Sequence, residues 1–276
     1  MKPKLAMVAL CFLILTSGCV QPNTPPLEPT AIPLTGEITF VGSTTVQPLA
    51  AKIGEAFNEH HPDVTLDIAA GGSNVGIKAI HDGSVDIGMA SRKLKAEEAK
   101  GMNVYQIAVD VLAVIVNESN PVQVLSSEQL KGIYLGEITN WREVGGEDKT
   151  IVVVIRESSS GTRGAFDEIV LSKKEPSAPE LEITITAGDM AATVLATPNA
   201  IGYVGFGNIE PGLKTLAIDG ITPSEESAKN GNYQLVRPLQ LLIGPLSQPI
   251  AQNFIDFALD EQGQQIVEDN GWVPVQ

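Results

Sequence analysis

A stretch of polar side chains between two apolar patterns is the part of this sequence best suited to chemistry. Residues 150–166 read TIVVVIRESSSGTRGAF. The β-branched run 151–155 predicts a strand buried on both faces, and a helical pattern begins at Arg163. Between them, Arg156 is followed by hydroxyls, a glycine and the N–H groups of a helix N-terminus. Nearly every group offered donates hydrogen bonds, so the stretch predicts a site for an anion such as phosphate or sulfate.

The same stretch also has a plainer interpretation, as a Ser/Thr helix cap with a solvated arginine beside it. The rest of the chain decides between the two. Strand patterns at 38–41, 64–68 and 85–90 are each followed by a turn rich in Gly or Ser, and helical patterns follow, including a charged surface helix at 93–100. One such turn is weak evidence because Gly and Ser populate turns generally. These three turns and the one at 156–162 make four, and together they favour a ligand site built from strand ends.

Composition and charge limit the class of protein. The chain has 276 residues, 43% of them hydrophobic and 18% charged, which is enough for a sizeable core and two α/β lobes. Its formal net charge of −15 argues against nucleic acid or an anionic membrane surface as a partner. An anion site must therefore rely on local donors. Both cysteines, Cys11 and Cys19, fall within the first twenty residues, so the folded part has no disulfide or cysteine metal site.

The N-terminus has the features of an export signal. Two lysines precede an apolar run at 5–15, which is short for a membrane span, and Thr-Ser-Gly-Cys follows. Residues 1–19 look like a lipoprotein signal in which Cys19 becomes the lipidated N-terminus, although the leucine usually found three residues before the cysteine is Thr16 here. An uncleaved anchor or an ordinary signal cut near Cys19 are the alternatives. Residues 20–36 contain five prolines and predict a semi-rigid tether.

The remainder alternates between strand and helix patterns. Residues 104–116 form a long apolar strand pattern with Asp110 near its middle, long enough to cross from one lobe to another, and 235–243 could return the chain. Ser126 and Gln129 form a capping box that opens a helix. Alternating elements with short loops predict an α/β fold of two lobes with largely parallel sheets.

An enzyme is disfavoured by the motif census. The sequence has no Gly-x-Ser-x-Gly, no Ser-x-x-Lys and no Walker A pattern. Its three histidines lie at predicted helix ends, where solvated roles are common: His60, His61 and His81. We therefore predict a binding protein rather than a catalyst, with no metal and no cofactor.

Several segments, taken in order, resemble the phosphate-binding proteins of Pst-type ABC phosphate importers. They are 42–50, 72–78, 86–92, 136–141, 156–162, 200–203, 263–267 and 271–274. The resemblance implies the periplasmic binding protein type II fold, in which two α/β lobes are joined by two crossing strands with the ligand between them. It predicts lobe 1 at 37–109 plus 237–276 and lobe 2 at 110–236.

The resemblance also implies which residues bind the ligand. The family's phosphate-contacting positions correspond here to Thr44, Thr45, Ser73, Arg156, Ser160, Gly161 and Thr162. The physical chemistry agrees, because arginine supplies planar charged donors suited to an oxyanion, and hydroxyls and helix N–H groups complete its hydrogen bonds.

One position departs from the family pattern. Some members place an aspartate after the serine of the fourth turn, where it accepts a hydrogen bond from protonated phosphate and so excludes sulfate, whereas this sequence has Arg92. Arg92 either adds a cation to the anion site or pairs with an acid at the surface. Selectivity for phosphate would then need another group, such as Glu157 or Asp110.

The function implied is that of an extracytoplasmic, lipid-anchored solute-binding protein. It would capture inorganic phosphate and deliver it to the permease and ATPase subunits of an ABC importer, held at the outer face of the cytoplasmic membrane by Cys19. The alternatives are a binding protein for another tetrahedral oxyanion (sulfate, molybdate or tungstate) and a phosphate-sensing component.

Overall fold

The computed structural model describes residues 33–275. The predicted signal with Cys19, and most of the predicted tether, lie outside these residues. Within them, no helix is long and apolar enough to cross a membrane. The first strand, β1 (Gly36–Gly42), begins where the tether was predicted to end.

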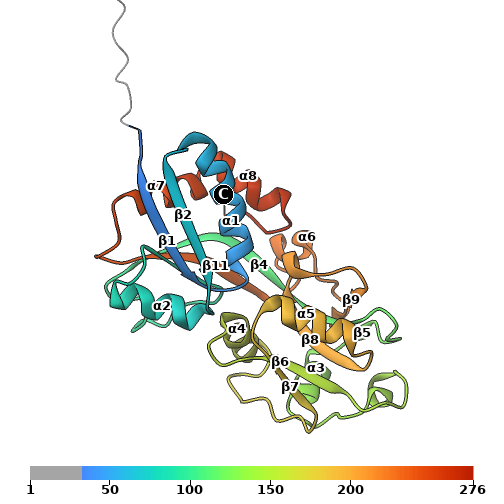
Figure 1. Ribbon diagram of the computed structural model, residues 1–276. Coiled ribbons are helices and arrows are strands. Elements are labelled where there is room, and N and C mark those ends of the chain that lie inside the picture. The colour runs from blue at the N-terminus through green and yellow to red at the C-terminus, as the bar shows by residue number, and fades with distance from the viewer. Residues whose placement is uncertain (1–32, 276) are drawn as a thin grey trace, which may run out of the picture. The chain divides into compact units, whose positions relative to one another are not determined.

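A nine-stranded sheet organises the described residues (Figure 1). Its other strands are β2 (Val64–Ala70), β3 (Ile87–Ala90), β4 (Asn103–Asn117), β6 (Val152–Arg156), β7 (Leu181–Thr184), β8 (Ala200–Gly205), β9 (Leu213–Thr215) and β11 (Val236–Ile243). The order is β2-β1-β3-β11-β4-β8-β6-β7, with β9 paired to β4. A separate two-stranded sheet joins β5 (Val124–Leu125) to β10 (Ala217–Ile218).

The two ends of the large sheet are parallel, as predicted, and its middle is not. In one end β1 pairs in parallel with β2 and β3, and in the other β6 pairs in parallel with β7 and β8. The long strands β4 and β11 run antiparallel to each other and to their neighbours β8 and β3. They therefore join two parallel sheets that belong to different parts of the chain.

Helices follow most strands. They are α1 (Val46–His60), α2 (Ser73–Asp82), α3 (Ser127–Tyr134), α4 (Gly161–Ile169), α5 (Ala187–Ala196), α6 (Glu225–Lys229), α7 (Ile250–Leu259) and α8 (Glu261–Asp269), with 3-10 turns η1 (Trp141–Val144) and η2 (Phe206–Asn208). The capping box predicted for α3 is confirmed, because Ser126 Oγ accepts from the Gln129 N–H and Gln129 Oε1 accepts from the Ser126 N–H.

The charged helix predicted at 93–100 is wrong, because this segment forms only turns. The carboxylate of Glu98 accepts hydrogen bonds from the Arg92 guanidinium and from the N–H of Lys95. These local bonds give the backbone an alternative to a helix.

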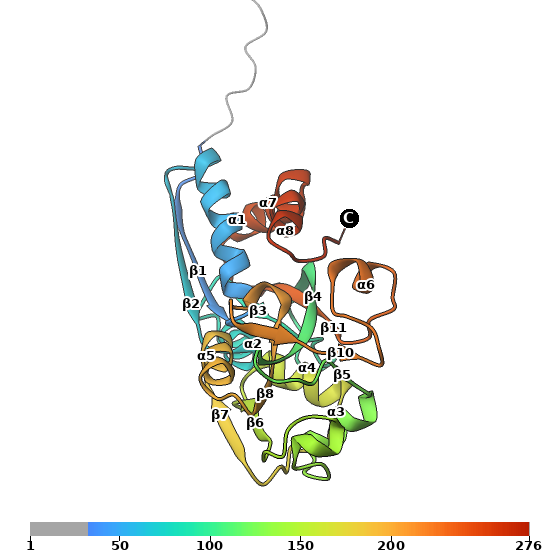
Figure 2. The same ribbon diagram turned by 90° about the vertical axis from the view of Figure 1, so that its right-hand side faces the viewer.

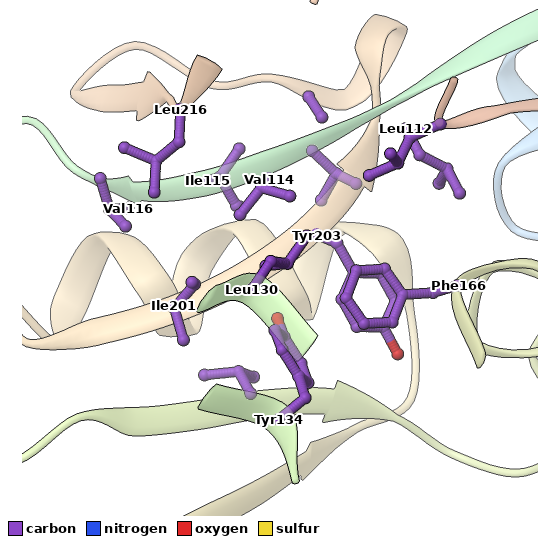
Figure 3. Packing of buried hydrophobic residues seen from close by; sticks show 14 of the residues in the cluster. Leu112, Val114, Ile115, Val116, Leu130, Tyr134, Phe166, Ile201, Tyr203 and Leu216 are labelled. Carbon is purple, nitrogen blue, oxygen red and sulfur yellow. The ribbon is translucent and has the colours of Figure 1, made fainter. Parts of the chain in front are cut away.

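The apolar core is divided between two large clusters. One lies among β1, β3, α1 and α7, where the rings of Phe40 and Phe254 are 4.9 Å apart. The other lies among β6, β8, α3 and α4, where Phe166 stacks on Tyr203 at 4.0 Å (Figure 3). We call these the first and second lobes. In both ribbon views α1 and α7 lie to one side of β4, and α3 and β7 lie to the other (Figure 2).

Strand β4 belongs to both lobes. Ala108 packs in the core of the first lobe and Val111 in that of the second. The chain therefore has the two-lobed type II fold of periplasmic binding proteins. The lobe boundaries at 109/110 and 236/237 remain a prediction from the sequence.

Candidate anion-binding site

Three helices from the two lobes begin at the same place. Thr45, at the start of α1 in the first lobe, has its Oγ1 3.2 Å from Oγ1 of Thr162 in α4 of the second lobe. Gly161 lies so close to the start of α2 that a Cβ at this position would be 2.0 Å from Ser73 Oγ. The first N–H groups of a helix have no partner within it and carry partial positive charge. The convergence of three such ends favours an anion.

Two glycines allow the lobes to approach this closely. A side chain at Gly161 would overlap Ser73 and Ser91, and one at Gly72 would lie 2.6 Å from Ser159 Oγ. Gly72 also has φ +86, which side-chain-bearing residues rarely adopt. Glycine is therefore required on both sides of the contact between the lobes.

Buried hydroxyls line the first-lobe side. Ser43 Oγ donates to Ser91 Oγ at 2.8 Å, and the N–H of Ser91 donates to Ser73 Oγ at 3.0 Å. All three serines are buried. Ser43 and Ser91 were not among the predicted site residues, although each occupies the same strand-end turn position that identified the others.

Arg156 ends β6 and is 1% exposed. Its Nη2 donates to the carbonyl of Ile185 at 2.6 Å and, across the lobes, to Thr44 Oγ1 at 3.2 Å. Both acceptors are neutral, and its Nε has no partner among residues 33–275. Burial lowers the pKa of Arg156 to about 10, so the side chain remains charged at neutral pH. The site therefore contains a buried cation without a carboxylate bonded to it.

The aromatic core of the second lobe fixes this arginine. Tyr203 Oη accepts from the N–H of Arg156 at 3.3 Å, and the ring of Tyr203 stacks on Phe166 of α4 (Figure 3). The stack thus ties β6 to the helix that follows it. Ser160 caps that helix by accepting from the Arg163 N–H at 3.3 Å. Its hydroxyl proton remains available to a ligand.

A second buried arginine was missed by the sequence analysis. Arg237 on β11 lies opposite Asp110 on β4 and donates to Asp110 Oδ2 from Nε at 2.9 Å and from Nη2 at 2.7 Å. Burial raises the pKa of Asp110, and the charge of Arg237 opposes the rise. Asp110 Oδ1 accepts from the N–H of Phe206 at 3.1 Å. A charged residue within an apolar strand pattern was the signal that identified Asp110 and applies equally to Arg237.

Arg92 is used elsewhere. Its two terminal nitrogens donate to both carboxylate oxygens of Glu98, at 2.8 and 2.9 Å, and Nη2 also donates to Asn74 Oδ1 at 2.7 Å. The arginine is only 11% exposed, so this is a partly buried ion pair rather than a solvated one. The structure shows the ion-pair alternative at Arg92. The other predicted residues, Thr44, Thr45, Ser73, Arg156, Ser160, Gly161 and Thr162, lie together at the convergence.

Comparison with known proteins places the chain in a family. Residues 28–262 match the family model described as a PBP superfamily domain. The phosphate-binding protein PstS of Bacillus subtilis (strain 168) is 34% identical over 248 residues, which cover 87% of this chain and 81% of that protein. The chain belongs to the PstS family.

Solved structures agree with this assignment. A chain from Clostridium perfringens, described as a phosphate ABC transporter substrate-binding protein with bound phosphate, superposes with a TM-score of 0.85 at 39% identity. The match covers 87% of the present chain and all of that one. An ABC-type phosphate transport receptor from Vibrio cholerae gives a TM-score of 0.72 at 33% identity, with 87% and 100% of the two chains covered.

Proposed function

We propose that this PstS-family chain captures inorganic phosphate between its lobes and delivers it to an ABC importer. The observation that carries the proposal is the charged, buried side chain of Arg156, whose Nε lacks a partner where three helix N-termini meet. Burying an ion without a counter-charge destabilises the folded protein by on the order of several kcal/mol. An oxyanion at this place would offset that cost.

The donors come from both lobes, and this gives the ligand a mechanical role. Thr45 and Ser73 belong to the first lobe, and Arg156 and Thr162 belong to the second. An anion bonded to all of them would hold the lobes closed, and its release would let them separate about the crossing strands. Binding would thereby create the closed form that a permease distinguishes from the open one.

No reaction is needed for this role. The groups at the site are donors to an oxyanion, and the comparisons place the chain among substrate-binding proteins of transporters. We further propose that Cys19 is lipidated and anchors the protein at the outer face of the cytoplasmic membrane. The permease and ATPase subunits of the importer would be its partners there.

The choice of anion is the part of the proposal most exposed to test. With Arg92 paired to Glu98, no carboxylate replaces the aspartate that some relatives have at this turn. Glu157 accepts from the hydroxyl of Ser159, and Asp110 is paired with Arg237. Hydroxyl oxygens such as those of Ser73 and Ser91 can accept the hydrogen bond of protonated phosphate instead.

Calorimetric titration with phosphate, sulfate and molybdate at neutral pH tests the proposal. We expect tight binding of phosphate that excess sulfate does not displace. Preference for sulfate or molybdate would leave the site in place and change the ligand, and binding of none of the three would overturn the proposal.

A further inference from the structure

We infer that Arg237 is a second guanidinium donor to the bound oxyanion, through its Nη1, and that Asp110 holds it in position. The inference rests on the proposed function and adds a ligand contact from a crossing strand, β11. Neither the sequence motifs nor the helix ends point to this residue.

The first observation is where the side chain reaches. Arg237 Nη2 donates to Thr45 Oγ1 at 3.3 Å, and that oxygen lies 3.2 Å from Thr162 Oγ1 of the other lobe. The guanidinium therefore extends from the crossing strand to the contact between α1 and α4. Arg156 reaches the neighbouring residue, Thr44, from the opposite side.

The second observation is an unused donor. Arg237 Nε and Nη2 have partners, but Nη1 is buried without one in the part of the chain that the structure describes, and the residue is 2% exposed. A buried donor without an acceptor destabilises the structure, because it has lost its hydrogen bonds to water and gained none in return. Arg156 Nε is in the same condition. Arg156 and Arg237 thus each have one unpaired donor and each bond to one of the adjacent residues Thr44 and Thr45. A single ligand that accepts from both donors would pair them.

The charges lead to the same conclusion. Of the two buried arginines, Arg237 is bonded to a carboxylate, that of Asp110, and Arg156 is bonded only to neutral oxygens. Within the described residues no carboxylate is hydrogen-bonded to the Arg156 guanidinium, and the charges of Glu157 and Asp189 act on it without a bond. The pKa of Arg156 is lowered first by burial and also by the positive charge of Arg237. An anion between them would relieve both the repulsion and the unpaired charge.

A purely structural role explains only part of this arrangement. A cross-strand ion pair between β4 and β11 accounts for Nε, Nη2 and the Asp110 carboxylate. It does not account for the contact with Thr45 or for the orphan Nη1. If the ligand uses that donor, it is bonded to the strands about which the lobes close.

The test begins with the unaltered protein, labelled with ¹⁵N in its arginine side chains. Phosphate addition should shift the side-chain signals of both Arg156 and Arg237, as assigned from single Arg→Lys variants. A shift confined to Arg156 would overturn the inference. Failure of the unaltered protein to bind phosphate would instead overturn the proposed function.

Affinity measurements provide the second test. Removing Arg237 alone would strand the buried charge of Asp110, so the variant is the neutral pair Asp110→Asn with Arg237→Met, checked by its thermal unfolding without ligand. We expect phosphate Kd to rise at least tenfold, while Asp110→Asn alone, which keeps the guanidinium, should raise it less. Arg237→Lys keeps a positive charge for Asp110 but loses Nη1, and it should also weaken binding. A phosphate Kd within threefold of wild type in both Arg237 variants would contradict the inference.

Discussion

The turns at 156–162 and 91–98 each hold a buried or partly buried arginine, but the two arginines have different bonding partners. Both place an arginine at the carboxyl end of a buried strand: Arg156 is the last residue of β6, and Arg92 lies two residues beyond β3. Arg92 finds the carboxylate of Glu98 six residues later in the chain and is neutralised by it. The guanidinium of Arg156 bonds only to neutral oxygens, so no bonded carboxylate neutralises its charge. The local supply of a carboxylate thus separates an arginine with a bonded counter-charge from the one that we propose binds the ligand.

The largest expected effect is at Arg156. Replacing it with alanine should weaken phosphate binding by about 2–5 kcal/mol, because a closed site would lose the main partner of the ligand's charge. This corresponds to a rise in Kd of about 30-fold or more. Calorimetry gives the value. Near-native affinity in this variant would place the ligand elsewhere.

Gly161 offers a steric test of the same turn. In Gly161→Ala the new Cβ would meet Ser73 Oγ at 2.0 Å and Ser73 Cβ at 2.8 Å, so the lobes would have to move apart. Overpacking of this kind costs about 1–3 kcal/mol, and it should appear as weaker phosphate binding. Titration of the variant measures the loss.

The matched control for this variant is Gly188→Ala. Gly188 also lies in the first turn of a helix, α5, but its nearest atom to a new Cβ is Thr186 Oγ1 at 3.8 Å, an ordinary contact. We expect this control to keep the wild-type affinity. Equal affinities of the two alanine variants would show that closure does not need a glycine at 161.

The contrast between the turns also shows how much of the site can be predicted from the sequence. Strand-end turns are local patterns, so the sequence could predict that the turns holding Thr45, Ser73 and Arg156 lie together. The bond between Arg237 and Asp110 joins residues 127 positions apart, and no local pattern specifies it. The acid that pairs with Arg92 was not identified for a different reason, because Glu98 lay within the helix predicted at 93–100.

The elements that the sequence analysis missed are short or lack periodicity. Strands β5 and β10 are two residues each, and they are stabilised by pairing with each other. Helix α6 is five residues long, and Ser224 and Ser227 cap it. Their stability comes from tertiary contacts and caps rather than from an apolar pattern.

A smaller effect is expected at Arg92. Arg92→Ala removes the ion pair with Glu98 and the bond to Asn74, whose own N–H and Nδ2 donate to Ser159 O and Ser158 O across the lobes. Phosphate affinity should fall by no more than about 1 kcal/mol, through this loosened contact, and the preference for phosphate over sulfate should not change. Competition titration checks both. A loss as large as that of Arg156→Ala, or a reversed preference, would make Arg92 a ligand.

The smallest effect concerns acid stability in the 91–98 turn. Hydrogen bonds from Arg92, and then from the Lys95 N–H, hold the pKa of Glu98 below its ordinary value. The folded protein therefore takes up this proton less readily than the unfolded chain does. The resulting stabilisation is present above the ordinary glutamate value of about 4.3 and is lost as the pH falls through the lowered folded pKa.

Denaturant unfolding without ligand, compared between wild type and Glu98→Gln from pH 7 to pH 3, measures this contribution. We expect wild type to be more stable by up to about 1 kcal/mol at neutral pH and the difference to disappear in acid. A difference that does not depend on pH would mean that the charge of Arg92 is not neutralised by Glu98. Arg92 would then be as free as Arg156 to bind an anion, and the distinction between the two turns would fail.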